Sequence, residues 1–184
     1  MLKNGLVIYS LLATGLLIGE SETYKRLDYQ YKVKKYDALR VYFDCSIGNL
    51  TMRPSNNRYI ITGKIEFNTA LSKPVISLTD KNNISRLDLS IKPDKAISND
   101  NSKSLINSLI EDGNDNYKIN FQMPTKIATD MNLNFGLGKV DLDFTGLRVS
   151  QLVMDCGLSD VSLINTKSNI VDCETVHIAT GVAD

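Results

Sequence analysis

Apolar and polar positions alternate through a short phrase that occurs more than once along the chain. Alternation with a period of two is typical of β-strands that bury one face. Within residues 131–142 the parity shifts once, at Gly138-Lys139, and small or polar residues suit a corner between two strands. The apolar positions around this corner are Met131, Leu133, Phe135, Leu137, Val140 and Leu142. We therefore expect two strands, joined by a corner, that bury the same face.

The phrase returns 21 residues later, with its corner at Ser159-Asp160. An upstream copy has its corner at Gly48-Asn49, and a final copy reaches Ala183-Asp184, 24 residues after the copy before it. The fragments CSIGN, FGLGK, CGLSD and TGVAD thus occupy one structural position. The linking segments 147–152 and 171–176 also match, so that Val149 corresponds to Cys173.

Repeats of this length, built from short strands, predict a β-solenoid, in which stacked coils bury a shared core. We expect an all-β fold: a single-stranded, right-handed, solenoid-like stack of coils of about 21 residues. The segment between the first two corners predicts an N-terminal β elaboration that covers one end of the stack, with a polar loop at residues 95–116. The alternative is an antiparallel sandwich. A leucine-rich repeat is not supported, because its LxxLxL frame is missing.

The N-terminus has the layout of a secretory signal peptide: Lys3, an apolar stretch over residues 5–19, then acids. Fifteen helical residues span only ~22 Å, less than the ~30 Å hydrocarbon core of a bilayer. We expect a cleaved signal peptide at residues 1–19, with a membrane anchor as the alternative and a buried helix as a further one. Residues 22–184 then form the β-domain, which we expect to be incomplete at its C-terminus.

Charge and composition exclude few classes of protein. The formal net charge is zero, and 42% of the residues are hydrophobic, which is ordinary for a globular chain. The densest basic stretch, at residues 31–36, contains three lysines and is too short to predict a nucleic-acid partner. The clustered tyrosines, among them Tyr29 and Tyr31, favour packing, with carbohydrate stacking as the alternative.

Acidic residues on solenoid strands raise the question of catalysis or calcium binding, both of which need carboxylates that lie close together. The outward acids of the repeats are Asp141, Asp143, Asp155 and Asp172. The repeat register places Asp155 between Asn134 and Ala179, and places Asp141 beside Ser162. Because the acids fall in different rows, we expect no catalytic residue, no metal site and no cofactor.

Cys45, Cys156 and Cys173 are the cysteines, and the odd count leaves at least one unpaired in an exported chain. All three correspond to apolar core positions, which favours small buried side chains, with a disulfide between coils as the alternative. The single histidine, His177, is expected to point outward and so cannot activate a buried cysteine.

The repeat phrases resemble a known family. DLDFTGLRVSQLVMDCGLSDVSL, preceded by MNLNFGLGKV, is similar to the toast-rack domain, whose relatives are described as putative adhesins and as C-terminal domains of some cell-envelope stress regulators. VYFDCSIGNLTMRPSNNRYIITGKIEFN is similar to the opening segment of that family. The resemblance covers roughly residues 38–184 and implies a stacked β-fold, envelope exposure and a non-catalytic role. The chain departs from it in its core cysteines, Cys45 and Cys156, and in ending within a repeat.

These observations predict a non-catalytic domain, exported to the periplasm or cell surface, that acts by surface contacts in adhesion or scaffolding. The alternative is a membrane-tethered regulatory or sensor domain of an envelope-stress response, and a glycan-active enzyme comes third. The expected partner is a protein or glycan of the cell envelope, not a nucleic acid. Membrane contact is expected only if the N-terminal segment is uncleaved. The last repeat, which stops at its corner, also predicts self-association through an open C-terminal edge.

Overall fold

The computed structural model describes residues 24–34, 38–69, 73–92 and 117–182. The predicted signal peptide and the predicted polar loop lie outside these residues. Within them the chain forms nine strands, which confirms the all-β class. The strands are β1 (Tyr24–Lys32), β2 (Ala38–Pro54), β3 (Ile60–Asn68), β4 (Val75–Lys81), β5 (Ile84–Ile91), β6 (Tyr117–Met123), β7 (Ala128–Asp143), β8 (Arg148–Ile164) and β9 (Thr175–Val182).

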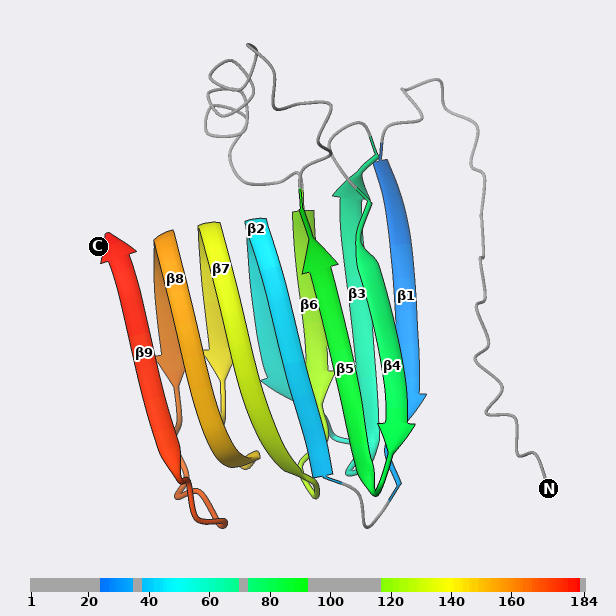
Figure 1. The fold of residues 1–184 in the computed structure, drawn as a ribbon, viewed down its shortest axis with the longest axis vertical. Helices are drawn as coiled ribbons and strands as arrows, with labels where there is room; N and C mark the ends of the chain where they lie inside the picture. The colour runs from blue at the N-terminus through cyan, green and yellow to red at the C-terminus, as the bar shows by residue number, and fades with distance from the viewer. Residues whose placement is uncertain (1–23, 35–37, 70–72, 93–116, 183–184) are drawn as a thin grey trace, which may run out of the picture.

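Three long strands, β2, β7 and β8, each contribute to two layers (Figure 1). The first half of β2, Ala38 to Cys45, pairs with β5, and its second half, Asn49 to Pro54, pairs with β6. β7 lies parallel to both halves of β2, and β8 lies parallel to β7. The front layer therefore has the order β4-β5-β2-β7-β8-β9, and the back layer has the order β1-β3-β6-β2-β7-β8.

The register predicted from the repeat is confirmed. Leu137 lies beside Ile47 of the upstream copy and beside Leu158 of the next one, and Cys156 lies beside Thr180 of the last copy. These pairings are parallel, so the antiparallel sandwich does not describe the repeats. Among the strand pairs that the structure describes, the antiparallel ones are β1-β3, β3-β6 and β4-β5. The repeated strands form one end of an open sheet, with each copy of the phrase as one rung.

The predicted corners are where the long strands pass from one layer to the other. Gly48 and Gly138 lie beside each other and have φ angles of 137° and 135°, which favour glycine. A Cβ atom on Gly138 would lie 1.9 Å from the carbonyl oxygen of Gly48, so the backbones approach too closely for any side chain. In the next rung, Ser159 holds the same position without a left-handed backbone and is buried. The corner therefore changes conformation from one rung to the next.

The core lies between the two layers and is built from rows of equivalent residues. One row runs through Phe43, Leu133, Met154 and Ile178, which are successive neighbours in the sheet. The first three are at most 2% exposed, whereas Ile178 is 42% exposed. The repeat register also predicts a core position for Leu158, the counterpart of Leu137, and its burial is wrong, because it is 60% exposed although Val182 of β9 lies beside it.

The predicted N-terminal elaboration covers the end of the stack opposite β9 (Figure 1). Strands β3 and β6 extend the back layer there, and the β4-β5 hairpin extends the front layer. The Tyr31 hydroxyl, on β1 of the back layer, donates a hydrogen bond of 2.5 Å to Asp80 of β4. The predicted packing is seen for Tyr29, because the centres of the Tyr29 and Phe121 rings lie 6.5 Å apart. Side-chain contacts thus join the two layers at this end.

Candidate functional site

The outward side chains of the front layer form a polar surface, called the front face from here on. Strand alternation places them opposite the core residues, and the parallel register arranges them in rows across β5, β2, β7, β8 and β9. The members used below are Arg86, Asp88, Arg40, Tyr42, Asp44, Asp130, Asn132, Asn134, Gln151, Asp155 and His177. The face is broad, because five neighbouring strands contribute to it.

Polar contacts between strands hold the side chains of the front face in place. Arg40 Nε lies 3.4 Å from Asp130 Oδ2, and the Ser150 hydroxyl donates to Asp130 Oδ1 at 2.7 Å. Asn134 Nδ2 donates to Asp44 Oδ1 at 3.1 Å. Each contact links neighbouring strands, so the outward side chains are positioned as well as exposed.

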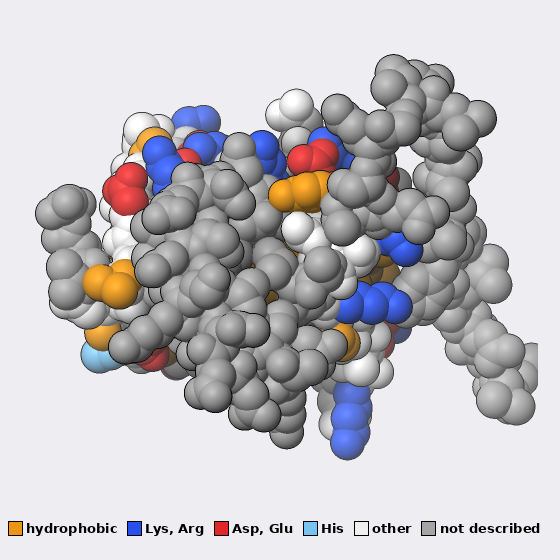
Figure 2. Space-filling model, turned by 90° about the horizontal axis from the view of Figure 1, so that it is seen from above, with side chains coloured by type: hydrophobic (Ala, Val, Ile, Leu, Met, Phe, Trp, Pro, Cys, Tyr) orange, Lys and Arg blue, Asp and Glu red, His pale blue; other side chains and the backbone are white. Residues whose placement is uncertain are grey.

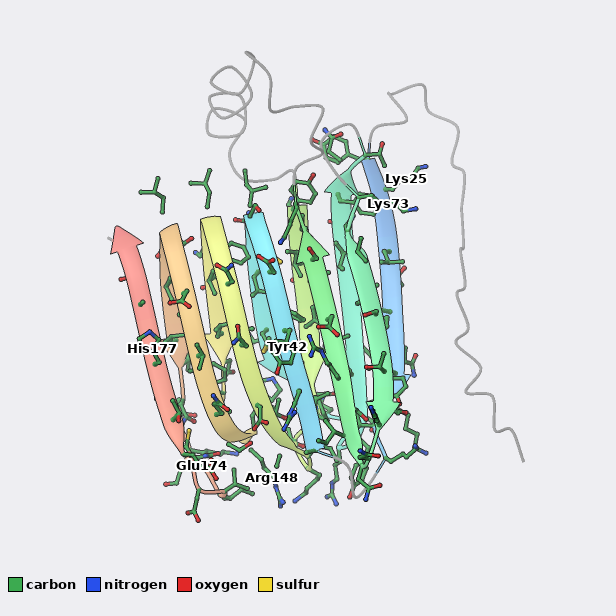
Figure 3. All side chains as sticks on the ribbon, viewed as in Figure 1. Lys25, Tyr42, Lys73, Arg148, Glu174 and His177 are labelled. Carbon is green, nitrogen blue, oxygen red and sulfur yellow. The ribbon has the colours of Figure 1, made fainter. Side chains whose placement is uncertain are left out.

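Tyr42 lies near the middle of the front face, and His177 lies on its β9 side (Figure 3). The guanidinium of Arg86 lies 4.0 Å from the centre of the Tyr42 ring, a distance typical of a cation–π contact. Arg86 also donates to Asp88, and this hydrogen bond raises the pKa of Arg86. Beside Tyr42 is a small depression of about 110 Å³, lined by Arg40, Val41, Tyr42, Asp130, Met131, Asn132 and Gln151. Aromatic, amide and charged side chains therefore line the same shallow depression.

The outward acids are dispersed, as the register predicts. Asp155 lies between Asn134 and Ala179, and Asp141 lies beside Ser162. Asp172 is exposed, in the segment before β9. Hydrogen bonds from the side chain and then the backbone of Thr145 lower the pKa of Asp143, which is thus engaged locally. Across the described ranges, no group of three or more His, Cys, Asp or Glu side chains is placed to hold a metal ion.

Calcium is expected to leave the melting temperature unchanged, because the carboxylates lie in different rows. A bound ion at 100 times its dissociation constant would add about 2.7 kcal/mol to the free energy of unfolding. The measurement is a thermal melt of the full chain in millimolar calcium and in chelator, with magnesium as the control. A rise in melting temperature with calcium but not with magnesium would contradict the dispersed arrangement of the carboxylates.

The cysteines divide into two buried thiols and one exposed thiol. All three are free. Burial raises the pKa of Cys45 to about 12, and burial also raises the pKa of Cys156. The expectation that Cys173 fills a core position is wrong. Its counterpart Val149 is buried, and the Asn169 side chain hydrogen-bonds to the Val149 backbone, whereas Cys173, just before β9, is exposed.

A thiol reagent is expected to label Cys173 rapidly in the native protein, and Cys45 and Cys156 only after unfolding. Reaction requires an accessible thiolate, and burial removes both access and ionisation from the two core thiols. Mass spectrometry of digested, labelled protein measures each site separately. A Cys173→Ser variant should lose the fast phase only, and fast native labelling of Cys156 would contradict its burial.

His177 points outward from β9, as predicted. Its Nε2 atom lies 3.9 Å from Asp155 Oδ1, with both side chains about 60% exposed. An exposed pair of this kind contributes little to stability. His177 is therefore a surface residue on the margin of the front face.

The contact between Tyr42 and Arg86 is the part of the front face that the sequence did not reveal. Both residues occupy outward positions of alternating segments, but β5 is outside the repeat. Its parallel pairing with β2 is therefore not fixed by any matching phrase. The alternation in SRLDLSI (85–91), with Arg86 and Asp88 both outward, was the available signal.

Comparison with solved structures supports the fold. The chain is similar to a putative cell adhesion protein from Clostridium sporogenes, at 18% identity and a TM-score of 0.61, over 76% of this chain and 60% of that one. A putative adhesin from Bacteroides fragilis also matches at 18% identity, over 76% of this chain and 55% of that one, with a TM-score of 0.29. The chain thus spans less than two thirds of either structure.

Three further findings concern relatives, membrane-spanning helices and family. A search of the curated proteins gave no match. Within the part of the chain that the structure describes, no helix has the length and apolar character needed to cross a membrane. The family model described as the N-terminal domain of toast_rack, DUF2154, matches residues 19–184, nearly the whole chain. The chain therefore belongs to the Toast_rack_N family, whose fold the stacked β-rungs display.

Proposed function

We propose that this chain is an exported, non-catalytic domain of the cell envelope that acts through surface contacts, in adhesion or scaffolding. The observation that carries the proposal is the front face: five neighbouring strands present mostly polar side chains in rows, several of them held by contacts between strands. A broad surface with only a small depression suits a large polar partner better than a small substrate, because catalytic and small-molecule sites are typically larger clefts or cavities. The structural neighbour described as a putative cell adhesion protein supports the same reading.

The contact surface is centred on Tyr42 and the depression beside it. Arg40 and Arg86 supply donors, Asp130 supplies an acceptor, and Asn132 supplies both. Because Arg40, Arg86 and Asp130 are already held by contacts with neighbouring side chains, little of their side-chain freedom is lost when a partner binds. A protein or a glycan of the envelope fits this chemistry.

The binding test uses envelope material isolated from the producing organism as the probe. The chain should sediment with it, and the Tyr42→Ala and Asn132→Ala variants should be retained severalfold less. Thr51→Ala and Asn120→Ala, outward positions of the back layer, serve as matched controls and should bind as the unmodified chain does. Equal retention of all variants, or none of the unmodified chain, would refute the front face as the contact surface.

Export is tested separately by N-terminal sequencing of the mature protein and by protease treatment of intact cells. A mature chain that begins near residue 20 and is degraded from outside supports the proposal. A chain that keeps residues 1–19 and stays in the membrane fraction supports the tethered sensor instead. A chain protected inside the cell would overturn export in either form.

A further inference from the structure

The pairing of β7 with β8 is irregular at one point of the front face, beside the depression. The 21-residue offset of the repeat would place Ser150 beside Thr129. Instead Val149 lies beside Thr129, and the next pair is Asp130 with Gln151, so Ser150 is the extra residue of a β-bulge. Val149 is buried, whereas Ser150 and Gln151 are not, and the bulge therefore presents two consecutive polar residues to the front face. Bulges often lie next to functional sites, where they re-aim a side chain.

The polar groups around the depression are of two kinds, those held by the protein and those left free. Asp130 accepts hydrogen bonds from Arg40 Nε and from the Ser150 hydroxyl, at 3.4 Å and 2.7 Å. Asn132 and Gln151 are exposed and line the depression, and their side-chain amides form no hydrogen bond within the part of the chain that the structure describes. A ligand there meets two amides, each with donors and an acceptor, beside a fixed carboxylate and a fixed guanidinium.

The charges around the depression balance. Arg40 lies 3.4 Å from Asp130, and Arg86 lies 2.7 Å from Asp88. Figure 2 marks the β9 margin of the molecule by its single histidine and shows acidic and basic side chains interspersed on the surface in view. An excess of cations would attract a partner that carries phosphate or carboxylate groups, and an excess of acids would attract a basic one. Paired charges of both signs favour an uncharged partner.

The front face is too polar to resemble the centre of a protein interface. Such centres are enriched in aromatic and apolar side chains, which contribute most of the binding energy. None of the exposed large hydrophobic side chains of the described residues belongs to the front face as defined above. Tyr42 is its one tyrosine, and the Arg86 guanidinium lies against the ring. A partner rich in hydroxyl groups matches a surface of amides, carboxylates and guanidinium groups better than an apolar protein surface does.

We propose that the depression beside Tyr42 binds one sugar unit of an uncharged glycan. Neighbouring hydroxyl groups on a sugar ring offer paired donors and acceptors, which planar amide, carboxylate and guanidinium groups meet two at a time. Asn132 and Gln151, the latter aimed by the bulge, bind these hydroxyls, and Tyr42 supplies an apolar wall. A volume of about 110 Å³ suits a single ring, and the broad face beyond it accommodates the rest of the glycan. The site belongs to the front face, so its assignment rests on the proposed function and names the class of partner.

The first experiment identifies the component of the envelope material that retains the chain. Material isolated from the producing organism is treated either with periodate, which cleaves the carbon–carbon bond between neighbouring hydroxyls, or with protease, and the reagent is removed. Sedimentation with the full chain then measures retention. Retention should fall severalfold or more after periodate and persist after protease. It should also change little between low salt and about 0.5 M salt, because an uncharged ligand has no counterions to release.

The outcomes separate a wrong ligand from a wrong function. Retention that protease removes and periodate leaves would overturn the glycan while keeping the front face as a contact surface, now for a protein. Retention that is lost at high salt would overturn an uncharged ligand in favour of an acidic one. If the untreated material fails to retain the unmodified chain, the proposed function fails, and the assignment of its ligand fails with it.

Variants test whether the depression is the place of contact. Gln151→Ala and Asn132→Ala should each lower retention severalfold, the loss expected when one or two hydrogen bonds are removed. Asn134→Ala is the matched control, because Asn134 is also exposed on β7, two residues farther along, but donates to Asp44 outside the depression. It should be retained as the unmodified chain is, and thermal melts should show all three variants folded. Equal losses for Asn132→Ala and Asn134→Ala, or no loss for Gln151→Ala, would overturn the site.

Discussion

Replacement of Gly138 by alanine is expected to lower the free energy of unfolding by about 3 kcal/mol or more, enough to unfold a marginally stable domain. Two independent causes act at this position. Its φ of 135° is a conformation that side chains rarely adopt, and the new Cβ would lie 1.9 Å from the carbonyl oxygen of Gly48. Because the obstacle is backbone, the corner itself has to move. Urea denaturation measures the loss.

Gly146→Ala separates the two causes. Gly146 also has a positive φ, of 76°, but a Cβ there would meet no atom within 4 Å. Gly146→Ala should therefore lower the free energy of unfolding only by the conformational strain, about 1–2 kcal/mol. If Gly138→Ala proved no more destabilising than Gly146→Ala, the close approach of the corners would not be present in solution.

A graded series in the next glycine row offers a second check on the same packing. An added Cβ would lie 2.3 Å from the nearest backbone oxygen at Gly136, 2.6 Å at Gly157 and 3.3 Å at Gly181. The loss of stability on substitution by alanine should fall in that order. Gly181 should be the most tolerant of the three, because a Cβ 3.3 Å from the carbonyl oxygen of Gly157 needs a shift of only a few tenths of an ångström.

The repeat made the register of the long strands predictable, and the reason is physical. Parallel neighbours in a stack bury equivalent residues in one row, so the pairing of Phe135 with Cys156 appears directly as a repeated phrase. The elaboration has no such copy. The parallel pairing of β5 with β2, and the hydrogen bond from Tyr31 to Asp80, join segments that share no pattern, and only packing determines them.

Burial near the end of the stack was the other point that the pattern did not reveal. Alternation reports which side of a strand a residue occupies, and it assigned Leu158 and Val176 to the core side correctly. Whether that side is covered depends on the next rung. Val176 lies on the last strand that the structure describes, and Leu158 lies beside Val182, the last residue of that strand; both remain more than half exposed. The same reasoning misplaced Cys173, which precedes the last described strand and is exposed, whereas its counterpart Val149 is buried.

Leu133→Asp is expected to prevent folding, with a loss of more than about 4 kcal/mol, whereas Ile178→Asp in the same core row should cost far less. Leu133 is 2% exposed between Phe43 and Met154, so an aspartate there would be buried without a partner. Ile178 is 42% exposed, so its replacement keeps the carboxylate in contact with water.

Circular dichroism and urea denaturation of the two variants decide the comparison. If Leu133→Asp proves too unstable to purify, Leu133→Ala provides the same contrast. It should cost about 2–5 kcal/mol, against a smaller loss for Ile178→Ala. Equal losses at the two positions would mean that the inward side of β9 is covered in solution, in contradiction to the 42% exposure of Ile178.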